Sequence, residues 1–272
     1  MQYFTEKIVT PLSKTATLTG YVLDNSQEID QDRVRPAVIV VPGGSYRFTS
    51  DREAEPVAVK MNSLGCQSFV LRYSCAPARY PTSLYELATA VAMVRQHAAD
   101  WHVDPNKIIV YGFSAGGHLA ASLATKWDQP ELTTAGFTAA EIQPNGLALA
   151  YPVITSGPFA HEESFQLLLG DEPSDDQLQN VSLEHQVTES TPPTFLWTVD
   201  DDAVVPMENS LLFGKALKKA GVSCELHVFA HGQHGMSMAD GQTAGPASPE
   251  MISTSVAVWQ TLFAHWLSEN FN

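Results

Sequence analysis

Wholly apolar runs alternate with stretches of helical periodicity along most of this chain, and this alternation restricts the folds open to it. Residues 37–41 (AVIVV) form a continuous apolar run, which is typical of a strand buried on both faces of a sheet. Residues 53–64 have helical spacing and end at Gly65, a residue type that commonly terminates helices. Strands that alternate with helices form a mostly parallel sheet with helices on both faces, so we predict an α/β fold. Further strands are expected at residues 67–73, 107–111, 146–150, 194–199 and 224–229, and further helices at 82–100, 119–125, 207–220 and 253–268.

Two other segments add to the predicted sheet. Within residues 6–24, threonine and valine recur in an alternating pattern, as in a short antiparallel hairpin at the N-terminus. Residues 155–192 show no clean period and are rich in Glu, Asp, Ser and Pro, so we expect them to cross the carboxyl edge of the sheet as an excursion. No internal repeat, low-complexity tract or linker divides the sequence. We therefore expect residues 1–272 to form a single domain.

The charge of the chain narrows the classes of partner. Fifteen basic and thirty acidic residues give a formal net charge of −15. Such a surface repels phosphate backbones and anionic membranes, so we expect neither a nucleic-acid nor a membrane partner. No apolar run approaches the ~18 residues that a membrane span requires. The first residues lack a basic stretch followed by an apolar one, and we therefore expect no secretory signal and a cytoplasmic location.

The pentapeptide GFSAG at residues 112–116 is a G-x-S-x-G motif, and it lies between the predicted strand at 107–111 and a predicted helix. A serine hydroxyl is a poor nucleophile unless it projects from a strained turn toward a base. Glycines on either side of that turn remove side chains that would collide in it. We therefore predict that Ser114 is a nucleophile, and that the backbone N–H of Ala115 points to the place where an oxyanion develops.

A second glycine-containing turn, PGGSY at residues 42–46, directly follows the predicted strand at 37–41. Two consecutive glycines let the backbone approach a substrate carbonyl and offer N–H donors to it. Taken alone, a proline-glycine pair is more often a plain turn. Beside a predicted nucleophile, however, the N–H groups of Gly44 and Ser45 are candidates for an oxyanion hole.

Candidates for an acid and a base follow the last two predicted strands. Where a G-x-S-x-G turn carries a nucleophile, the partners follow along the chain in the order Asp or Glu, then His. Three aspartates occupy residues 200–202, and His231 and His234 lie in the later segment HGQHG. An acidic run before a helix is often an N-cap, so at least one aspartate is expected to be structural. His227 lies within its strand and His118 on the helix after the nucleophile, and both positions favour packing or hydrogen bonding.

These segments together resemble the esterase branch of the α/β-hydrolase superfamily that includes bacterial acetyl esterases and acetylxylan-esterase-like enzymes. The resemblance runs from residue 36 to the C-terminus and rests on PGGSY, YPTSLYEL, DPNKIIVYGFSAGGHLAASLA, SLEHQVTESTPPTFLWTVDDDAVVP and ELHVFAHGQHG. The family pattern D-x-x-V-P is matched from Asp202, and the pattern G-x-H-G contains His234, so the resemblance selects these two residues. The chain departs from many relatives in having PGGS in place of H-G-G-G, and Glu86 in place of a usual aspartate.

The resemblance implies an α/β-hydrolase fold and a serine carboxylesterase whose partner is a small-molecule ester. In that mechanism Ser114 attacks the ester while His234 takes its proton and Asp202 holds the imidazole. The N–H groups of Ala115 and of Gly44 or Ser45 stabilise the oxyanion. No metal or organic cofactor is implied. The same triad also serves an arylformamidase or a peptidase of this fold. A non-catalytic hydrolase-fold binding protein is the alternative from another class, although such relatives usually lose a triad member.

A preference for short acyl groups, acetyl to butyryl, is expected from the resemblance and from the composition of residues 155–192. A long acyl chain gains about 0.8 kcal/mol per buried methylene only where an apolar trough receives it. The segment carries eight acidic residues, and its compact apolar cluster is the leucine triplet at 167–169. If this polar segment lies over the substrate, it favours a small acyl group and a water-soluble alcohol such as a sugar.

Overall fold

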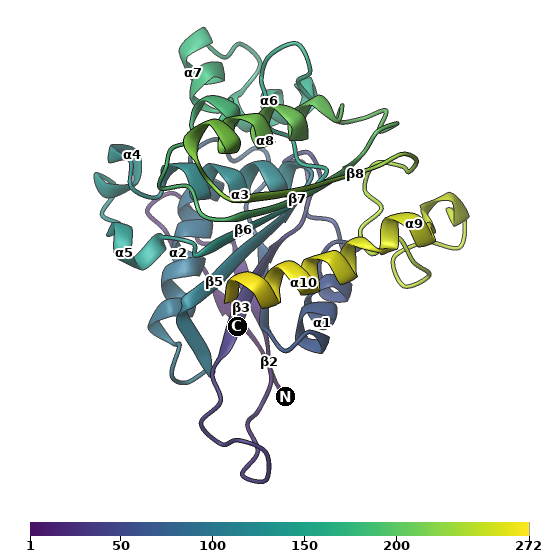
Figure 1. The fold of residues 1–272 in the computed structure, drawn as a ribbon. Coiled ribbons are helices and arrows are strands. Elements are labelled where there is room, and N and C mark those ends of the chain that lie inside the picture. The colour runs from purple at the N-terminus through teal and green to yellow at the C-terminus, as the bar shows by residue number, and fades with distance from the viewer. Residues whose placement is uncertain (272) are drawn as a thin grey trace.

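Eight strands form one sheet in the part of the chain that the computed structural model describes, residues 1–271 (Figure 1). They are β1 (Gln2–Lys7), β2 (Thr17–Val22), β3 (Arg35–Val41), β4 (Gln67–Arg72), β5 (Val103–Phe113), β6 (Gly146–Ala150), β7 (Thr194–Val199) and β8 (Cys224–Phe229). Their order in the sheet is β1-β2-β4-β3-β5-β6-β7-β8. Strands β3 to β8 pair in parallel, whereas β1 with β2 and β2 with β4 pair antiparallel. The predicted mostly parallel sheet with an antiparallel N-terminal hairpin is therefore confirmed.

The apolar run at residues 37–41 lies inside the sheet, where no edge or face of it meets water. In β3, Ile39 pairs with Phe69 of β4 on one side and with Val110 of β5 on the other. All three side chains are fully buried. A strand with neighbours on both edges and helices on both faces has no solvated surface, which explains the absence of polar residues from this run. Its carboxyl end brings the turn at residues 42–46 beside the end of β5.

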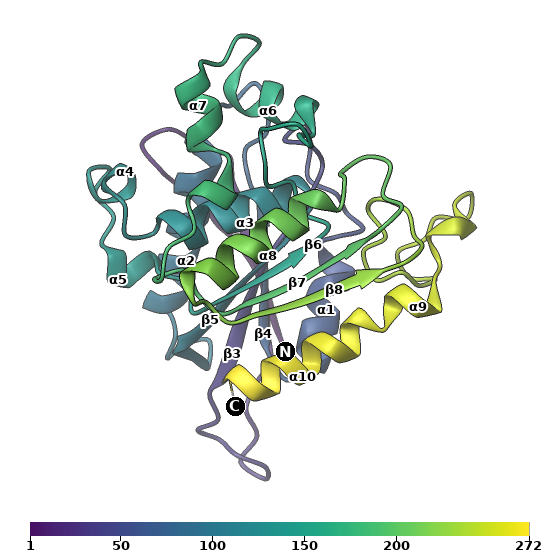
Figure 2. The same ribbon diagram turned by 45° about the horizontal axis from the view of Figure 1, so that its top comes forward.

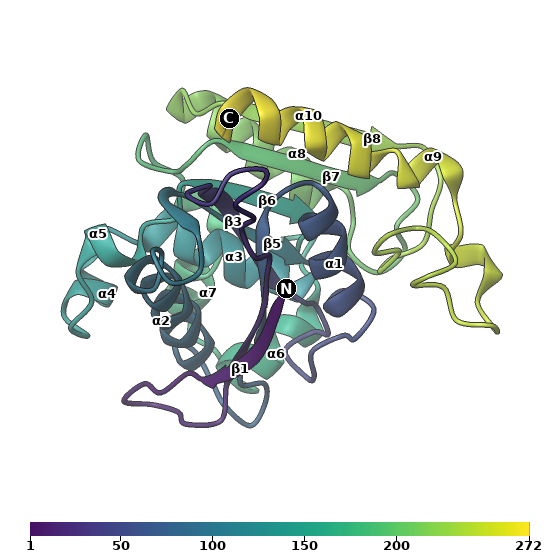
Figure 3. The ribbon, with the colours of Figure 1, turned by 90° about the horizontal axis from the view of Figure 1, so that it is seen from below.

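Helices cover both faces of the sheet and divide the core into two layers. They are α1 (Glu55–Ser63), α2 (Thr82–Gln96), α3 (Ala115–Lys126), α4 (Pro130–Thr133), α5 (Ala139–Ile142), α6 (Glu162–Leu169), α7 (Asp175–Asn180), α8 (Glu208–Ala220), α9 (Thr254–Ala257) and α10 (Trp259–Phe271), with 3-10 turns η1 (Leu183–His185) and η2 (Pro249–Met251). Helices α2, α3 and α8 cover one face, and α1 and α10 the other (Figure 2, Figure 3). Leu87, Leu119 and Phe213 belong to the first layer, and Met61 and Phe263 to the second. Between residues 1 and 271, no helix is both long and apolar enough to cross a membrane.

An aromatic stack on the α10 face holds the loop that follows β8. Trp197 of β7 stacks on Trp259 of α10, with ring centroids 5.6 Å apart and planes 12° apart. The Nε1–H of Trp197 donates to Tyr111 OH at 3.0 Å. Trp259 donates in turn from Nε1 to the backbone carbonyl of Ser237 at 2.9 Å. Because both tryptophans are fully buried, they fix this loop against a rigid layer of the core.

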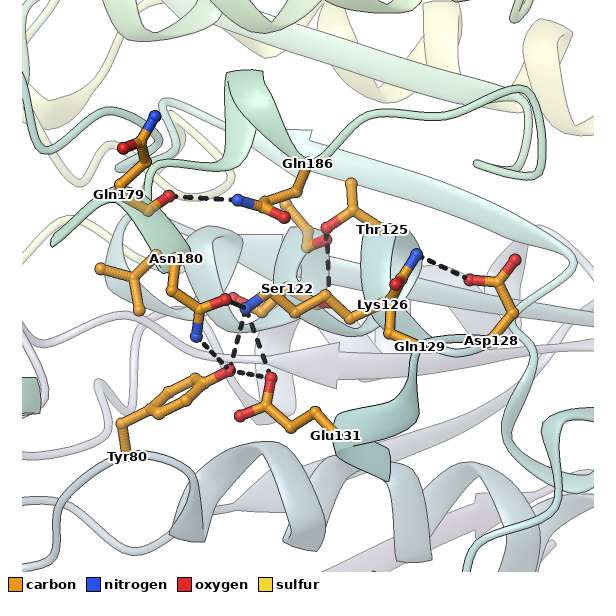
Figure 4. A network of polar contacts seen from close by, with 12 residues as sticks. Tyr80, Ser122, Thr125, Lys126, Asp128, Gln129, Glu131, Gln179, Asn180 and Gln186 are labelled. Carbon is orange, nitrogen blue, oxygen red and sulfur yellow. Dashed lines mark hydrogen bonds and ion pairs between the residues drawn. The ribbon is translucent and has the colours of Figure 1, made fainter. Parts of the chain in front are cut away.

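A buried lysine ties α3 to the predicted excursion at residues 155–192 (Figure 4). Lys126 is 2% exposed, and its Nζ lies 2.9 Å from both Tyr80 OH and Asn180 Oδ1 and 3.5 Å from a Glu131 carboxylate oxygen. Burial lowers the pKa of Lys126, and the Glu131 carboxylate opposes that shift. Since Asn180 ends α7 inside the excursion, this network holds the excursion on the helix that follows the GFSAG turn.

The differences from the sequence-based prediction have local causes. Strand β5 is longer than the predicted 107–111 at both ends, because Val103 pairs with Arg35 of β3 and Phe113 still pairs with Ala150 of β6. Residues 155–192 contain α6, α7 and η1, none of which the sequence predicts. Helix α7 begins at a capping box on Ser174 and spans six residues, too few to show a helical period. The one-turn helices α4 and α5 escape prediction for the same reason.

Candidate active site

The turn at Ser114 has a backbone conformation that only its surroundings can hold. Ser114 has φ +51° and ψ −120° between β5 and α3, a conformation that costs a non-glycine residue on the order of 1–3 kcal/mol. Its N–H donates to the carbonyl of Ala150 at 3.0 Å, and its carbonyl accepts from the N–H of Val153 at 3.1 Å. A Cβ on Gly112 would stand 2.3 Å from the carbonyl oxygen of Gly116, so the turn requires glycine there. These contacts hold the serine at the carboxyl end of β5.

Three side chains form a continuous line of hydrogen bonds at this edge of the sheet. Ser114 Oγ lies 2.8 Å from His234 Nε2, and His234 Nδ1 lies 2.7 Å from Asp202 Oδ2. Asp202 Oδ1 accepts from the N–H groups of Val204 and Val205, each at 2.9 Å. The Asp202 carboxylate is fully buried, and the His234 side chain is 16% exposed. Because a carboxylate only accepts, Nδ1 carries the proton and Nε2 is left to accept from the serine hydroxyl. The triplet can therefore move a proton from serine to imidazole.

The neighbouring aspartate and histidine candidates form a separate pair at the surface. Asp201 accepts from the N–H of Gly232 at 2.8 Å and contacts His231 Nδ1 at 3.2 Å. The hydrogen bond from Gly232 is the main reason why the pKa of Asp201 is lowered. The pair fastens the loop after β7 to the loop after β8, beside the triplet. Among residues 1–271, no three His, Cys, Asp or Glu side chains gather as they would to hold a metal ion.

The predicted oxyanion donors border the triplet. A pocket of about 160 Å³ is lined by Gly44 and Ser45 together with Ser114 and His234. The N–H of Gly43 is bound by the buried carboxylate of Glu53, whereas no hydrogen bond of this kind within residues 1–271 occupies the next two amides, which are the predicted donors. Ala115 is the first residue of α3, and an N–H at that position has no acceptor within its own helix. Four of the predicted site residues thus line this pocket, and the other two adjoin them: Ala115 follows Ser114 in the chain, and Asp202 binds His234.

Two buried polar residues beside the pocket are not predicted by the sequence analysis. Glu53 accepts from the N–H of Gly43 at 2.8 Å and from the hydroxyl of Tyr151 at 2.7 Å. Glu53 falls within the predicted helix at 53–64 and carries no local sign of another role. Tyr151 directly follows the strand at 146–150. Its position could have indicated a site residue, because ligands of parallel sheets bind beyond the carboxyl ends of strands.

His118 is a buried histidine that packs beneath the pocket. It is 1% exposed, and its Nδ1 and Nε2 each lie 2.8 Å from a partner, Tyr46 OH and the carbonyl of Val181. Because a carbonyl only accepts, Nε2 donates to Val181 and Nδ1 accepts from Tyr46. Burial lowers the pKa of His118 to about 4, so the ring is neutral at pH 7. It joins the turn after β3 to residues 155–192.

The excursion packs directly against the turn after β3. Arg47 forms an ion pair with Glu163 of α6. Leu168, the centre of the leucine triplet, is buried in the core, and its carbonyl accepts from the N–H of Tyr80 at 2.9 Å. His161 lies just before α6. Burial lowers the pKa of His161, and the nearby His234 lowers it further. Glu163 and His161 thus place polar groups of the excursion against Arg47 and near His234.

Similarity to known proteins extends over most of the chain. A model of the BD-FAE family matches residues 23–217. An endo-1,4-beta-xylanase B from Butyrivibrio fibrisolvens is 35% identical over 215 residues, which are 78% of this chain and 34% of that protein. An acetylxylan esterase from Xylanibacter ruminicola is 29% identical over 205 residues, which are 73% of this chain and 40% of that protein. The chain thus spans between a third and two fifths of the length of these curated relatives.

Solved structures match nearly the whole chain. The carboxylesterase Cest-2923 from Lactobacillus plantarum has a TM-score of 0.88 and 29% identity, over 99% of this chain and 98% of that one. An acetyl ester-xyloside bifunctional hydrolase from Caldicellulosiruptor lactoaceticus has a TM-score of 0.80 and 37% identity, over 93% of this chain and 88% of that one. The likeness therefore covers the sheet, both helix layers and the edge where the triplet lies.

Substitution of His118 should change how the stability of the protein depends on pH. The pKa of the ring is about 4 in the folded protein against 6.5 for the ordinary group. Protonation therefore favours unfolding, and stability is lost as the pH falls from 6.5 toward 4. The difference corresponds to about 3 kcal/mol. In His118→Gln this contribution should be absent when free energies of unfolding in urea are compared between pH 7 and pH 4. Parallel pH dependences of the two proteins would contradict a neutral buried ring.

Proposed function

The chain belongs to the BD-FAE family, in the acetyl-esterase-like branch of the α/β-hydrolase superfamily, and from this we propose that it is a serine carboxylesterase. The observation that carries the proposal is the triplet, in which Ser114 Oγ lies 2.8 Å from His234 Nε2 and His234 Nδ1 lies 2.7 Å from Asp202. The three residues follow β5, β7 and β8 in the chain order serine, aspartate, histidine that α/β-hydrolases use. A small-molecule ester is the proposed substrate.

The geometry supports a two-step reaction through an acyl-enzyme. Ser114 Oγ attacks the ester carbonyl carbon while its proton passes to His234 Nε2, and Asp202 stabilises the imidazolium. The carbonyl oxygen becomes an oxyanion that accepts from the N–H of Ala115 and from that of Gly44 or Ser45, and each such donor contributes about 3 kcal/mol. The tetrahedral intermediate then collapses: its bond to the alcohol oxygen breaks, and that oxygen takes the proton from the imidazolium. Water then attacks the acyl carbon with the same base, and the serine is released.

A short acyl group, such as acetyl, fits the surroundings of the triplet. The pocket of about 160 Å³ is similar in volume to a cavity of about 150 Å³ that holds one benzene molecule, so it receives a small group. The Arg47–Glu163 ion pair and His161 make the adjoining part of the excursion polar, and a long acyl chain gains nothing by contacting such groups. The names of an acetylxylan esterase and an acetyl ester-xyloside hydrolase among the relatives support an acetylated carbohydrate as the natural ester.

Labelling of the nucleophile tests the serine mechanism. A serine-reactive phosphonate should abolish turnover of p-nitrophenyl acetate and should modify Ser114, as mass spectrometry of digested peptides can establish. Ser114→Ala should remove the label and lower turnover by several orders of magnitude, because the members of a triad act as a unit. The matched control is Ser122→Ala, which removes another buried serine of the same helix region and should keep both label and turnover. Labelling of a different serine would refute the assignment.

The choice between adjacent aspartates can be tested in the same assay. Asp202→Asn should reduce kcat by about 10⁴-fold, because an amide no longer fixes the productive imidazole tautomer. Asp201→Asn removes a neighbouring carboxylate that also bonds a histidine and a backbone N–H, and it should cost far less. An equal loss of kcat in the two variants would contradict the role proposed for Asp202.

A series of p-nitrophenyl esters tests the acyl preference. The value of kcat/KM should fall steadily from acetyl or butyryl to octanoyl, because additional methylenes meet polar groups or water and no apolar trough. Each ester has the same leaving group, so the series isolates the acyl side. A maximum at octanoyl or longer, or strong activation at a lipid–water interface, would show that the excursion covers an apolar acyl site.

A further inference from the structure

A buried polar bridge joins two loops on which the proposed reaction depends, although no step of that reaction uses it. Glu53 is 4% exposed and lies just before α1. Its Oε2 accepts from the N–H of Gly43 at 2.8 Å, and its Oε1 accepts from the hydroxyl of Tyr151 at 2.7 Å. Each oxygen of one carboxylate therefore holds a different part of the site, the turn after β3 and the residue that follows β6.

The tyrosine end of this bridge reaches the loop that carries the histidine. Tyr151 is fully buried, its hydroxyl accepts from the N–H of Ser237 at 3.0 Å, and its ring meets the His234 ring edge to face at a centroid distance of 5.1 Å. Its own N–H donates to the carbonyl of Trp197 at 2.7 Å. Burial and the Glu53 carboxylate raise the pKa of Tyr151, so the hydroxyl keeps the proton that it donates to Glu53. The ring position is thus fixed from several sides.

The carboxylate end sets how the turn after β3 approaches the nucleophile. A Cβ on Gly43 would stand 2.8 Å from Glu53 Oε2 and 2.9 Å from the Cβ of Ser114, so the Gly43 backbone packs closely against both residues. The next two residues along the chain, Gly44 and Ser45, are the proposed oxyanion donors. The Gly43 N–H belongs to the peptide unit at which this stretch begins. The Gly43 carbonyl shares the next planar unit with the N–H of Gly44, and it accepts from the N–H of Ser50 at 2.9 Å. The hydrogen bond to Glu53 therefore holds the turn from one side of Gly43 and the bond from Ser50 holds it from the other.

We propose that Glu53 and Tyr151 are positioning residues that hold the proposed oxyanion donors at a fixed position relative to the His234 ring. This inference rests on the proposed serine mechanism and deepens it. Glu53 fixes the amides of the turn, Tyr151 fixes the imidazole, and the hydrogen bond between them keeps the two parts at a constant separation. Neither side chain forms a hydrogen bond to Ser114 or His234, so both act through the groups that they hold. Both act on the geometry of the transition state, in which the oxyanion and the imidazolium exist together.

Glu53→Gln separates this role from a merely structural one. An amide offers one acceptor oxygen, and its NH2 group only donates, so it cannot accept from both Gly43 and Tyr151. We expect kcat for p-nitrophenyl acetate to fall about 10- to 100-fold with little change in KM, because small displacements of positioned groups act mainly on the transition state. Affinity for a short trifluoromethyl ketone, which forms an oxyanion on Ser114, should fall in proportion to kcat/KM. Glu53→Asp, which keeps both acceptor oxygens, should recover part of the loss.

Glu86→Gln is the matched control. Glu86 is fully buried, and its carboxylate also accepts from one backbone N–H and one hydroxyl, both of Ser74, at 2.7 and 2.5 Å. Ser74 lines a different pocket from that of the triplet. The control variant should lower Tm, as Glu53→Gln does, but should leave kcat and the affinity for the ketone unchanged.

Tyr151→Phe keeps the test decisive if Glu53→Gln does not fold. It removes a single oxygen from the other end of the bridge, and it should reproduce the fall in kcat and in ketone affinity. Unchanged kcat in either folded variant, or an equal loss in Glu86→Gln, would overturn the proposal. Wild-type turnover and phosphonate labelling of Ser114 belong in the same series. Their failure would refute the serine mechanism itself, whereas wild-type activity with undiminished variants refutes only the positioning role.

Discussion

The positive φ of Ser114 is a local conformation that the chain would not adopt alone, and most of the site follows from how it is held. The cost, on the order of 1–3 kcal/mol, is offset by hydrogen bonds of the Ser114 backbone to Ala150, the last residue of β6, and to Val153 beyond it. Helix α3 must also begin close to the end of β3. A Cβ on Gly116 would stand 2.1 Å from the carbonyl oxygen of Val41, so glycine there lets the turn at Ser114 and the turn at residues 42–46 share one edge.

The buried charged groups at this edge have partners that only the folded chain supplies. A buried carboxylate without hydrogen bonds is strongly destabilising. Asp202 accepts from two backbone N–H groups and a histidine, and Glu53 from one N–H and one phenol. Donors fixed in the backbone cannot relax away when charge changes during a reaction. The same contacts that allow these carboxylates to be buried therefore also give the site a preorganised electrostatic environment.

Sequence reasoning predicted the sheet, and it singled out Ser114 as the proposed nucleophile, because both signals are local. An apolar run and a G-x-S-x-G turn each occupy a few consecutive residues. The three aspartates at 200–202 share one local pattern, and resemblance to a family was needed to choose among them. The structure shows the physical difference: Asp202 turns inward to the N–H groups of Val204 and Val205, whereas Asp201 bonds Gly232 at the surface.

The bridge of Glu53 and Tyr151 could not be found in this way, since its meaning lies in distant partners. Glu53 is separated from Tyr151 by 98 residues and from Gly43 by 10. No periodicity or turn signal connects such positions. From the sequence alone, a glutamate near the start of a helix is an ordinary first-turn residue. The packing of the excursion likewise depends on contacts between residues that are distant in the sequence. It is held by Lys126, whose burial follows from contacts to Tyr80 and Asn180 and not from any pattern around it.

The two faces of the sheet support different members of the triplet. On one face, α3 packs with α2 and the excursion and fixes the start of the helix after the serine. On the other face, the stack of Trp197 on Trp259 holds the loop of the histidine through the Ser237 carbonyl. The triplet lies where these two layers meet, beyond the strand ends, and this is how residues 120 positions apart approach within 2.8 Å. Tyr151 stands at the same junction, with its hydroxyl bound to Glu53 and Ser237. Tyr151 belongs to the core layer on the α10 face, and the bridge ties the loop of the histidine to the turn after β3, so that a shift of either loop disturbs the hydrogen bonds of the other.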